Sequence, residues 1–253
     1  MGWDPDVYMK FAGERTRPAV ELLARVRLAS PSRVIDLGCG PGNSTALLAA
    51  RWPNAKIEGL ESSPEMLAKA RLSGVQAKWI AGNVEWWSPA EHYDVIFSNA
   101  ALHWIADHHR LLPRLMGHVA DGGALAFQVP QNFNAPSHTL MRETAERGHW
   151  AAKLMNARQV SVQTPENYFD ILLPFSQSID IWETEYLQVL EGDDPVLAWV
   201  SGTGLRPFLQ PLDPGEREEF LADYRRRLHT AYPRRPDGKT LFPFKRLFVV
   251  AMH

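Results

Sequence analysis

A glycine-rich turn after a short apolar run carries most of the recognisable chemistry in this 253-residue sequence. The run Val34–Leu37 includes Asp36, and Gly38, Gly40 and Gly42 follow at every second position. Glycine accepts positive φ angles and lets the backbone approach a bound molecule closely. An acidic residue at this place would repel a pyrophosphate, so the pattern favours a ligand with a cationic group. A tight turn without a ligand is the alternative, but three glycines are more than such a turn needs.

The residues after the glycines distinguish this loop from two other nucleotide-binding loops. A phosphate-binding P-loop requires Lys followed by Ser or Thr, whereas Asn43 and Ser44 stand here. A dinucleotide-binding loop has the pattern Gly-x-Gly-x-x-Gly, and the third glycine, Gly42, comes one residue early. A nicotinamide-dependent oxidoreductase is therefore a distant alternative.

Two later strand ends carry polar residues that suit a nucleoside. Glu61 lies 21 residues after Gly40, where a carboxylate can accept hydrogen bonds from both ribose hydroxyls. Asn83 follows a third apolar run, and its side chain could bind an adenine edge beside the Val84 amide. A helix N-terminal role for Glu61 and a turn role for Asn83 are the alternatives. Three such ends in order are more specific than any one of them, because the carboxyl ends of parallel strands meet at one edge of a sheet.

Strands and helices that alternate along the chain must position these residues. The pattern of apolar residues predicts strands over 33–37, 56–60, 76–80, 93–98, 124–129, 178–189 and 240–252. It predicts helices over 43–51, from Pro64, and over 107–119, 137–150, 165–173, 194–200 and 214–230. This alternation implies a parallel sheet with helices on both faces, closed by an antiparallel pair of strands.

We expect a single domain. Its core would comprise residues of about 30–130, 174–190 and 239–253, after an N-terminal helical segment over 1–29. Two cap insertions, at about 131–165 and 190–238, have too few apolar residues for a core of their own.

Composition excludes several classes of protein. Hydrophobic residues make up 45% and charged residues 22%, as in ordinary globular proteins. A single cysteine, Cys39, excludes an internal disulfide and a multi-cysteine metal site. No apolar run is long enough for a membrane span, and the N-terminus does not resemble a signal peptide, so we expect a soluble cytoplasmic protein.

The charge of the chain is unevenly distributed. The net charge of −2 argues against a protein that mainly binds nucleic acid without sequence preference. Residues 206–253 contain ten basic and six acidic residues, so this part is net +4 and the remainder is net −6. Arginine outnumbers lysine 20 to 7, and its planar guanidinium suits carboxylates and phosphates. These observations predict an arginine-lined anion site, with a solvated helix face as the alternative.

The glycine loop resembles motif I of the class I S-adenosylmethionine-dependent methyltransferases, in which such a loop holds the aminocarboxypropyl part of the cofactor. Longer segments resemble, within this family, the methyltransferases that act on trans-aconitate: residues 11–23, 36–45, 99–104, 201–210 and 246–251. The resemblance runs from Trp3 to the C-terminus and is weakest over 150–165. It implies a Rossmann-like α/β fold with a seven-stranded, mostly parallel sheet and an antiparallel last strand. It also implies a cytoplasmic enzyme that forms a monomethyl ester and S-adenosylhomocysteine.

The strand ends, the matched segments and the N-terminal residues together provide the candidate site residues, and no metal ligand is among them. For the cofactor S-adenosylmethionine they are Tyr8, Phe11, Arg15, Asp36, Gly38, Cys39, Gly40, Asn43, Glu61, Ser62, Met66, Asn83, Val84, Glu85, Asn99 and Ala100. For a small polycarboxylate substrate they are Trp3, Arg17, His103, Trp104, Arg206 and Arg246.

A carboxylate is already ionised at neutral pH, so we expect no general base and no catalytic dyad. The arginines would bind the carboxylates that do not react, because an arginine on the attacking oxygens would make them less nucleophilic. A methyltransferase for another small acid or an amine is the nearest alternative, and a non-catalytic cofactor-binding protein is a further one. A nucleic-acid methyltransferase is disfavoured by the net charge and by Ser98-Asn99-Ala100-Ala101, where such enzymes carry an Asn-Pro-Pro-Tyr type of motif. The oligomeric state is not indicated.

Overall fold

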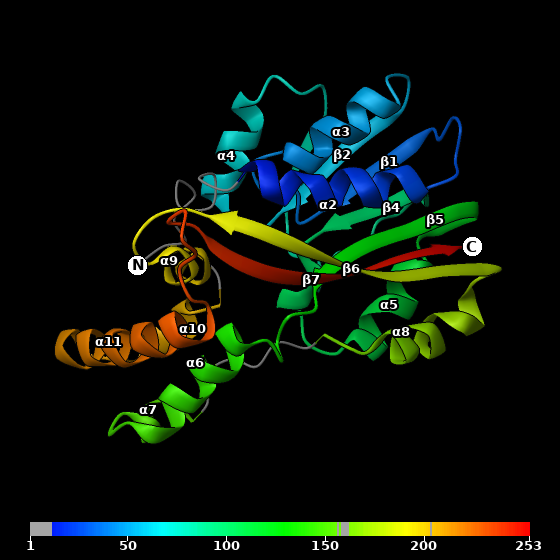
Figure 1. Cartoon of the computed structure of the whole chain (residues 1–253). Coiled ribbons are helices and arrows are strands. Elements are labelled where there is room, and N and C mark those ends of the chain that lie inside the picture. The colour runs from blue at the N-terminus through cyan, green and yellow to red at the C-terminus, as the bar shows by residue number, and fades with distance from the viewer. Residues whose placement is uncertain (1–11, 156, 158–161, 203) are drawn as a thin grey trace. The chain divides into compact units, whose positions relative to one another are not determined.

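The computed structural model describes residues 12–155, 157, 162–202 and 204–253 (Figure 1). The chain divides into two compact units, which we name by their main elements. The sheet unit comprises Phe11–Pro130, Val160–Thr184 and Arg246–His253. The helical unit comprises Met1–Lys10, Gln131–Gln159 and Glu185–Lys245. The expected single domain with two cap insertions stays a prediction.

Within the described residues one sheet has seven strands, in the order β3-β2-β1-β4-β5-β7-β6 (Figure 1). Their bounds are β1 Arg33–Leu37, β2 Lys56–Glu61, β3 Lys78–Ala81, β4 Tyr93–Asn99, β5 Val119–Pro130, β6 Ser178–Leu190 and β7 Thr240–Met252. Strands β1 to β5 pair in parallel, and β7 pairs antiparallel with β5. The expected Rossmann-like sheet with an antiparallel last strand is confirmed.

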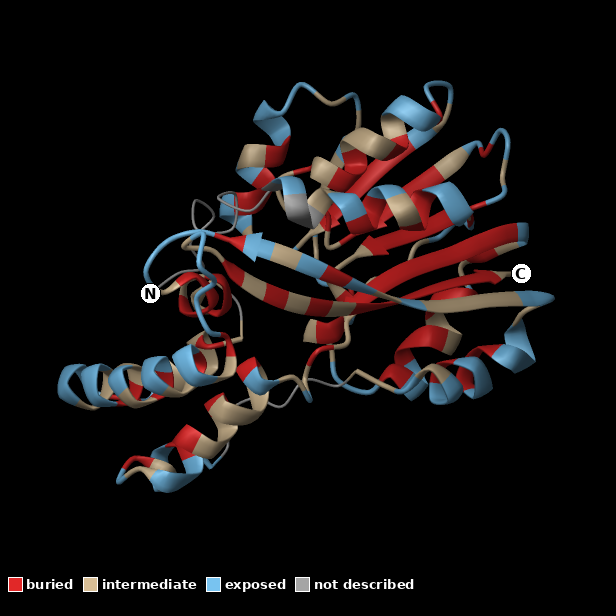
Figure 2. Cartoon of the chain, in the orientation of Figure 1, coloured by how far each residue is buried: buried red, intermediate tan, exposed pale blue. Residues whose placement is uncertain are grey.

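The central strands are apolar because both of their faces are covered. Val34, Ile35 and Leu37 of β1 are fully buried, as are Val95 and Ile96 of β4. A parallel sheet covered on both faces produces such continuous apolar runs. Figure 2 shows buried residues along the central strands and exposed residues on the outer sides of the helices.

The helices of the sheet unit agree with the expected pattern. Within the described residues they are α2 Ala12–Arg25, α3 Asn43–Arg51, α4 Pro64–Leu72, α5 His108–Met116 and α8 Pro165–Leu172, with the 3₁₀ turns η1 Leu102–Trp104 and η2 Leu173–Phe175. Helix α4 begins as predicted, with Pro64 in its first turn and the Ser63 hydroxyl accepting a hydrogen bond from the Met66 amide. No helix in the described part of the chain is long and apolar enough to cross a membrane.

Two strands begin at residues other than those predicted, whereas the ends of the strands agree with the prediction to within one residue. Strand β3 begins at Lys78 and not at Gln76, because its pairing with β2 starts where Lys78 lies opposite Glu58. Strand β5 begins at Val119 and not at Ala124, since Tyr93 already pairs with Val119 before an irregularity in the register. Gly122 and Gly123, which lie between Val119 and Ala124, interrupt the apolar pattern and hid this early start.

The helices of the helical unit, within the described residues, are α6 Pro136–Arg147, α7 Ala151–Leu154, α9 Pro195–Ser201, α10 Arg206–Leu209 and α11 Pro214–Ala231. The prediction of one helix through Trp150 was wrong. The backbone is extended at Gly148, and the Trp150 indole turns back to donate a hydrogen bond to the Thr144 carbonyl at 2.9 Å. The short helix α10 was not predicted, because its four residues contain no repeat of apolar positions.

Candidate functional site

The glycine loop between β1 and α3 adopts the conformation that its sequence requires. Gly38, Gly40 and Gly42 have φ angles of 71°, 56° and 96°, in the left-handed region that favours glycine. A Cβ at Gly38 would lie 2.3 Å from the Cβ of Ala101, so no larger residue fits there. A Cβ at Gly40 would meet nothing within 4 Å, so open space adjoins the loop at this residue. The loop therefore offers a place where a molecule can contact the backbone.

Asp36 anchors this loop from the buried end of β1. Its Oδ2 accepts hydrogen bonds of 2.7 Å from the hydroxyls of Ser44 and Thr45 in the first turn of α3. Its Oδ1 is also buried and has no hydrogen-bond partner within the described residues. Burial raises the pKa of Asp36 to about 6, against the hydrogen bonds from the two hydroxyls. A buried oxygen without a partner, on the strand that leads into the glycine loop, suits a ligand that donates hydrogen bonds or carries positive charge.

Glu61 connects the glycine loop to the start of α4. Its Oε2 accepts a hydrogen bond from the Gly40 amide at 3.0 Å, and its Oε1 accepts one from the Ser63 amide at 2.7 Å. The Oε1 also accepts a longer hydrogen bond from the Ser62 hydroxyl at 3.4 Å. The Oε2 keeps a second lone pair that can accept a further hydrogen bond. The structure thus brings together Asp36, the glycines and Glu61, as the strand ends predicted.

The remaining candidate residues near α4 and β3 have different surroundings. Cys39 is buried, and burial raises the pKa of its thiol well above the ordinary range. Met66 is buried in α4, whereas the neighbouring Ser62 is exposed. Asn43 begins α3.

The segment after β3 forms a turn. The exposed Asn83 accepts a hydrogen bond from the Glu85 amide through Oδ1 at 2.8 Å. Val84 is buried, and its carbonyl accepts a hydrogen bond from the Arg114 side chain at 2.7 Å. The turn role that was the alternative for Asn83 is therefore present, and binding of adenine by this turn stays a prediction.

The carboxyl end of β4 contains a strained residue and a polar network. Ala100 has a φ angle of 54°, which is uncommon for a residue other than glycine. The Asn99 Oδ1 accepts a hydrogen bond from Gln128 Nε2 in the neighbouring strand β5. Gln128 Oε1 accepts a hydrogen bond from Arg246 Nη1 at 3.1 Å. In η1, which follows β4, the rings of His103 and Trp104 lie 4.5 Å apart.

The candidate substrate residues lie on several elements. Arg246 is 5% exposed and belongs to the sheet unit. Arg17 lies exposed on α2 and forms an ion pair with Glu21 at 2.8 Å. Arg206 begins α10 of the helical unit. The candidates outside what the structure describes are Trp3, Tyr8, Phe11 and the side chain of Arg15.

Sequence reasoning missed several buried polar residues. Gln128 was hidden in an apolar strand, and Ser44 and Thr45 were not assigned a role. Asn132, in the helical unit, is 3% exposed, and neither polar atom of its side chain has a hydrogen-bond partner within the described residues. A polar residue within or just after a buried strand was the available signal, but it does not reveal the partner.

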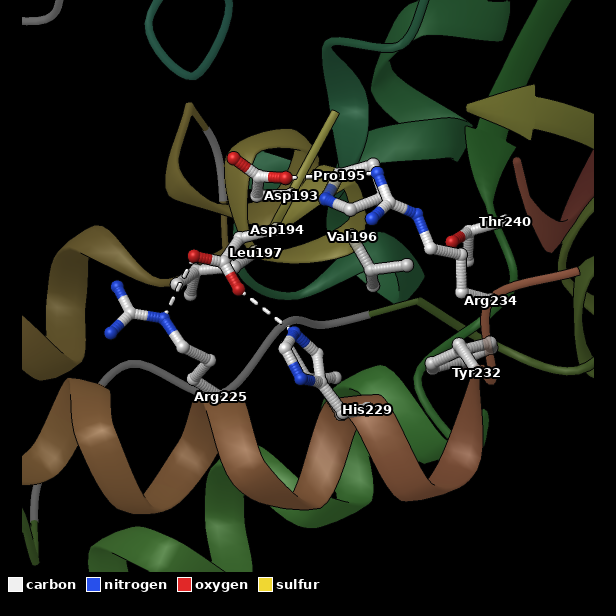
Figure 3. Close-up of a pocket in the computed structure, with 11 residues that line it drawn as sticks. Asp193, Asp194, Pro195, Val196, Leu197, Arg225, His229, Tyr232, Arg234 and Thr240 are labelled. Carbon is white, nitrogen blue, oxygen red and sulfur yellow. Dashed lines mark hydrogen bonds and ion pairs between the residues drawn. The ribbon is translucent and has the colours of Figure 1, made fainter. Parts of the chain in front are cut away.

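A pocket of about 260 Å³ in the helical unit has a different character (Figure 3). Asp194, at the start of α9, contacts Arg225 at 2.9 Å and His229 at 2.8 Å, both on α11. Arg234 and Asp193 lie 3.6 Å apart at the same pocket. The acidic side chains at this pocket thus already have basic side chains or a histidine as partners.

Comparison with known proteins adds a family to this geometry. A family described as a methyltransferase domain matches residues 11–172. The chain is 48% identical to the trans-aconitate 2-methyltransferase of Azoarcus, over 99% of this chain and 98% of that protein. It is also 48% identical to the trans-aconitate 2-methyltransferase of Streptomyces avermitilis, over 98% of this chain and 96% of that protein.

Solved structures agree in fold. The YcgJ protein of Bacillus subtilis aligns with a TM-score of 0.62 and 13% identity, over 93% of this chain and 97% of that one. A putative methyltransferase of Bacillus halodurans aligns with a TM-score of 0.59 and 12% identity, over 93% and 98%. At such low identity these two matches support the fold alone.

Proposed function

Because the chain belongs to the trans-aconitate 2-methyltransferase family, we propose that it transfers a methyl group from S-adenosylmethionine to one carboxylate of trans-aconitate. The products would be the monomethyl ester and S-adenosylhomocysteine. One observation carries the cofactor part of the proposal: the unpartnered Oδ1 of Asp36 is buried beside a glycine loop with open space at Gly40.

The residues present fit S-adenosylmethionine. The buried Asp36 oxygen suits the cationic amino group, and Gly40 leaves room for the amino-acid part of the cofactor. Glu61 can accept a hydrogen bond from a ribose hydroxyl with the second lone pair of Oε2, and with Oε1 in place of the long hydrogen bond from Ser62. The turn of Asn83 and Val84 would bind the adenine. When bound, S-adenosylmethionine supplies a methyl group on a positively charged sulfur, and loss of that group leaves S-adenosylhomocysteine. The other proposed contacts of the cofactor are Tyr8, Phe11, Arg15, Gly38, Cys39, Asn43, Ser62, Met66, Glu85, Asn99 and Ala100.

The chain has to bind and orient the acid, because the acid needs no activation. The carboxylates of such an acid are ionised at neutral pH, so no side chain has to remove a proton. Arg246 and Arg206 would bind the carboxylates that do not react, leaving the third one free to attack. His103 and Trp104, whose rings contact each other, would cover the reacting group and exclude water. Trp3 and Arg17 complete the proposed substrate site.

The proposal also covers the class of molecule that the protein binds and its location in the cell. A small polycarboxylate as the substrate, in place of a nucleic acid, is supported by the net charge of −2. A cytoplasmic location is supported by the family resemblance alone.

The decisive test is incubation of the protein with S-adenosylmethionine and trans-aconitate. We expect the acid to gain the mass of one methylene group while an equal amount of S-adenosylhomocysteine forms. A panel of other di- and tricarboxylic acids and small amines, assayed with methyl-labelled cofactor, serves as the comparison. Faster labelling of another compound would show that this compound, and not trans-aconitate, is the preferred substrate. If no compound is labelled, the proposed enzymatic function is wrong.

A further inference from the structure

Three polar side chains form a connected network across β4, β5 and β7, which are neighbours in the sheet (Figure 1). Arg246 donates a hydrogen bond to Gln128 Oε1, and Gln128 donates one from Nε2 to Asn99 Oδ1. Gln128 is completely buried. The strand register explains the contact: Arg246 lies opposite Pro130, and Gln128 lies two residues earlier on the same face of β5.

Gln128 is uncharged, and this affects the guanidinium of Arg246. An amide oxygen accepts a hydrogen bond from the guanidinium without cancelling its positive charge. A carboxylate at this position would instead form a buried ion pair with Arg246. The contact with Gln128 therefore orients the guanidinium of Arg246 without itself cancelling the positive charge.

The network also fixes the orientation of Asn99. Arg246 can only donate, so the oxygen of the Gln128 amide must face it and the nitrogen must face Asn99. The Asn99 oxygen accepts from that nitrogen, which turns the Asn99 Nδ2 away from Gln128. This Nδ2 has no hydrogen-bond partner within the described residues. The two ends of the network are thus a cation and an amide donor, and both suit a carboxylate.

We propose that Gln128 is a positioning residue that holds Arg246 and Asn99 as hydrogen-bond donors for a substrate carboxylate. Gln128 acts through these two neighbours and selects polycarboxylates over uncharged analogues. This inference rests on the proposed function and adds to it the residue that keeps the site selective for anions.

Two substitutions of similar size separate this role from a merely structural one. Gln128→Met removes both hydrogen bonds and keeps the side-chain length. Gln128→Glu keeps an acceptor for Arg246, but its carboxylate offsets the positive charge of the Arg246 guanidinium. The same carboxylate draws the Asn99 Nδ2 toward itself. We expect Gln128→Glu to melt at the same or a higher temperature than Gln128→Met, because it retains the contact with Arg246. A purely structural role would make substrate binding follow this order of stability.

The measurement is the binding of trans-aconitate, by titration calorimetry, to protein saturated with S-adenosylhomocysteine. Both variants should bind trans-aconitate about tenfold or more weakly, since a hydrogen bond to a charged group contributes at least that factor. Gln128→Glu should bind it no better than Gln128→Met, despite its higher stability. The affinity for S-adenosylhomocysteine should fall less than that for trans-aconitate, because the Gln128 side chain is hydrogen-bonded to Asn99 but to no other proposed cofactor contact within the described residues. KM for trans-aconitate should rise more than kcat falls.

Tyr168→Phe is the matched control. Tyr168 is fully buried and hydrogen-bonded to His108 at 2.6 Å, and it packs against Phe127, which lies on the opposite face of β5 from Gln128. This variant also loses a buried hydrogen bond, and we expect its affinity for trans-aconitate to be unchanged.

The outcomes are distinguishable. If the wild-type protein neither binds nor methylates trans-aconitate, the proposed function is wrong and the role of Gln128 falls with it. If the wild-type protein does both and the two Gln128 variants bind like it, only the role of Gln128 is overturned. Binding that follows the order of stability would also overturn it.

Discussion

Asp36→Asn should make the cofactor-free protein more stable at neutral pH while it weakens binding of the cofactor. Burial raises the pKa of Asp36 from an ordinary 3.8 to about 6. Between these pH values the folded protein binds more protons than the unfolded chain, so stability falls as the pH rises through this window. Above it, the ionised carboxylate reduces the free energy of unfolding by about 3 kcal/mol.

The asparagine removes this charge but introduces a donor. Its amide oxygen can accept the hydrogen bonds from Ser44 and Thr45, which leaves its NH₂ group at the position of Oδ1, where there is no partner. A buried donor without a partner costs about 1–3 kcal/mol. The net gain at pH 7 is therefore about 1 kcal/mol, and it should disappear by about pH 4, where the cost of the buried carboxylate has become smaller than the cost of the unpaired donor.

Cofactor binding should change in the opposite direction. An interaction of the Asp36 carboxylate with a cationic amino group is worth about 1.5–3 kcal/mol, so the Kd for S-adenosylmethionine should rise about ten- to hundredfold.

Urea unfolding at pH 7 and pH 4, together with calorimetric titration of the cofactor, tests both effects. Asp94→Asn is the control, because the Asp94 carboxylate accepts hydrogen bonds from the amides of Ser32 and Arg33, at the opposite end of the sheet from the glycine loop. It should leave cofactor affinity unchanged. A variant at Asp36 that is less stable than the wild type at pH 7, or whose gain persists at pH 4, would refute the reasoning.

Four further predictions concern charge, backbone and substrate. Burial by itself would raise the pKa of Glu58. Hydrogen bonds, above all from Lys78, outweigh this effect, so the pKa lies below its ordinary value. Glu58→Gln should therefore destabilise the protein at pH 7, and in urea unfolding this difference should vanish as the pH falls below about 4; a difference that persists would contradict it. Burial lowers the pKa of His138 to about 4, so between pH 6.5 and 4 the unfolded chain binds a proton that the folded protein does not, and stability falls as the pH falls. His138→Gln should flatten the fall in melting temperature over this window, and an unaltered pH profile would count against this. Gly40→Ala should lower stability by only about 1–2 kcal/mol, because only its φ angle is strained, yet weaken cofactor binding in calorimetry because its methyl group fills the open space. Arg206→Lys and Arg206→Ala should raise KM for trans-aconitate in steady-state kinetics, and an unchanged kcat/KM in both would remove Arg206 from the site.

Local features of the sequence were sufficient to predict the conformation of the glycine loop and the strand ends around it. The glycine loop depends on the φ angles of its own residues, and the cap at Ser63 depends on residues within one helical turn. Asp36 and Glu61 follow from their places at strand ends, because a parallel sheet brings these ends to one edge. Such features extend over a few residues, so the chain order alone reveals them.

Contacts between distant segments were beyond such reasoning. The early start of β5 depends on its pairing with Tyr93 of β4.

The sequence by itself determined the fold class, the glycine loop and the order of the strand ends, since each rests on periodicity or on the allowed φ angles of single residues. Only the tertiary structure decided which buried polar groups meet. Gln128 and Arg246 are separated by 118 positions and join only because β7 runs antiparallel beside β5 in one particular register. A shift of one residue would turn each side chain to the other face, and this register is set by the packing of the whole sheet.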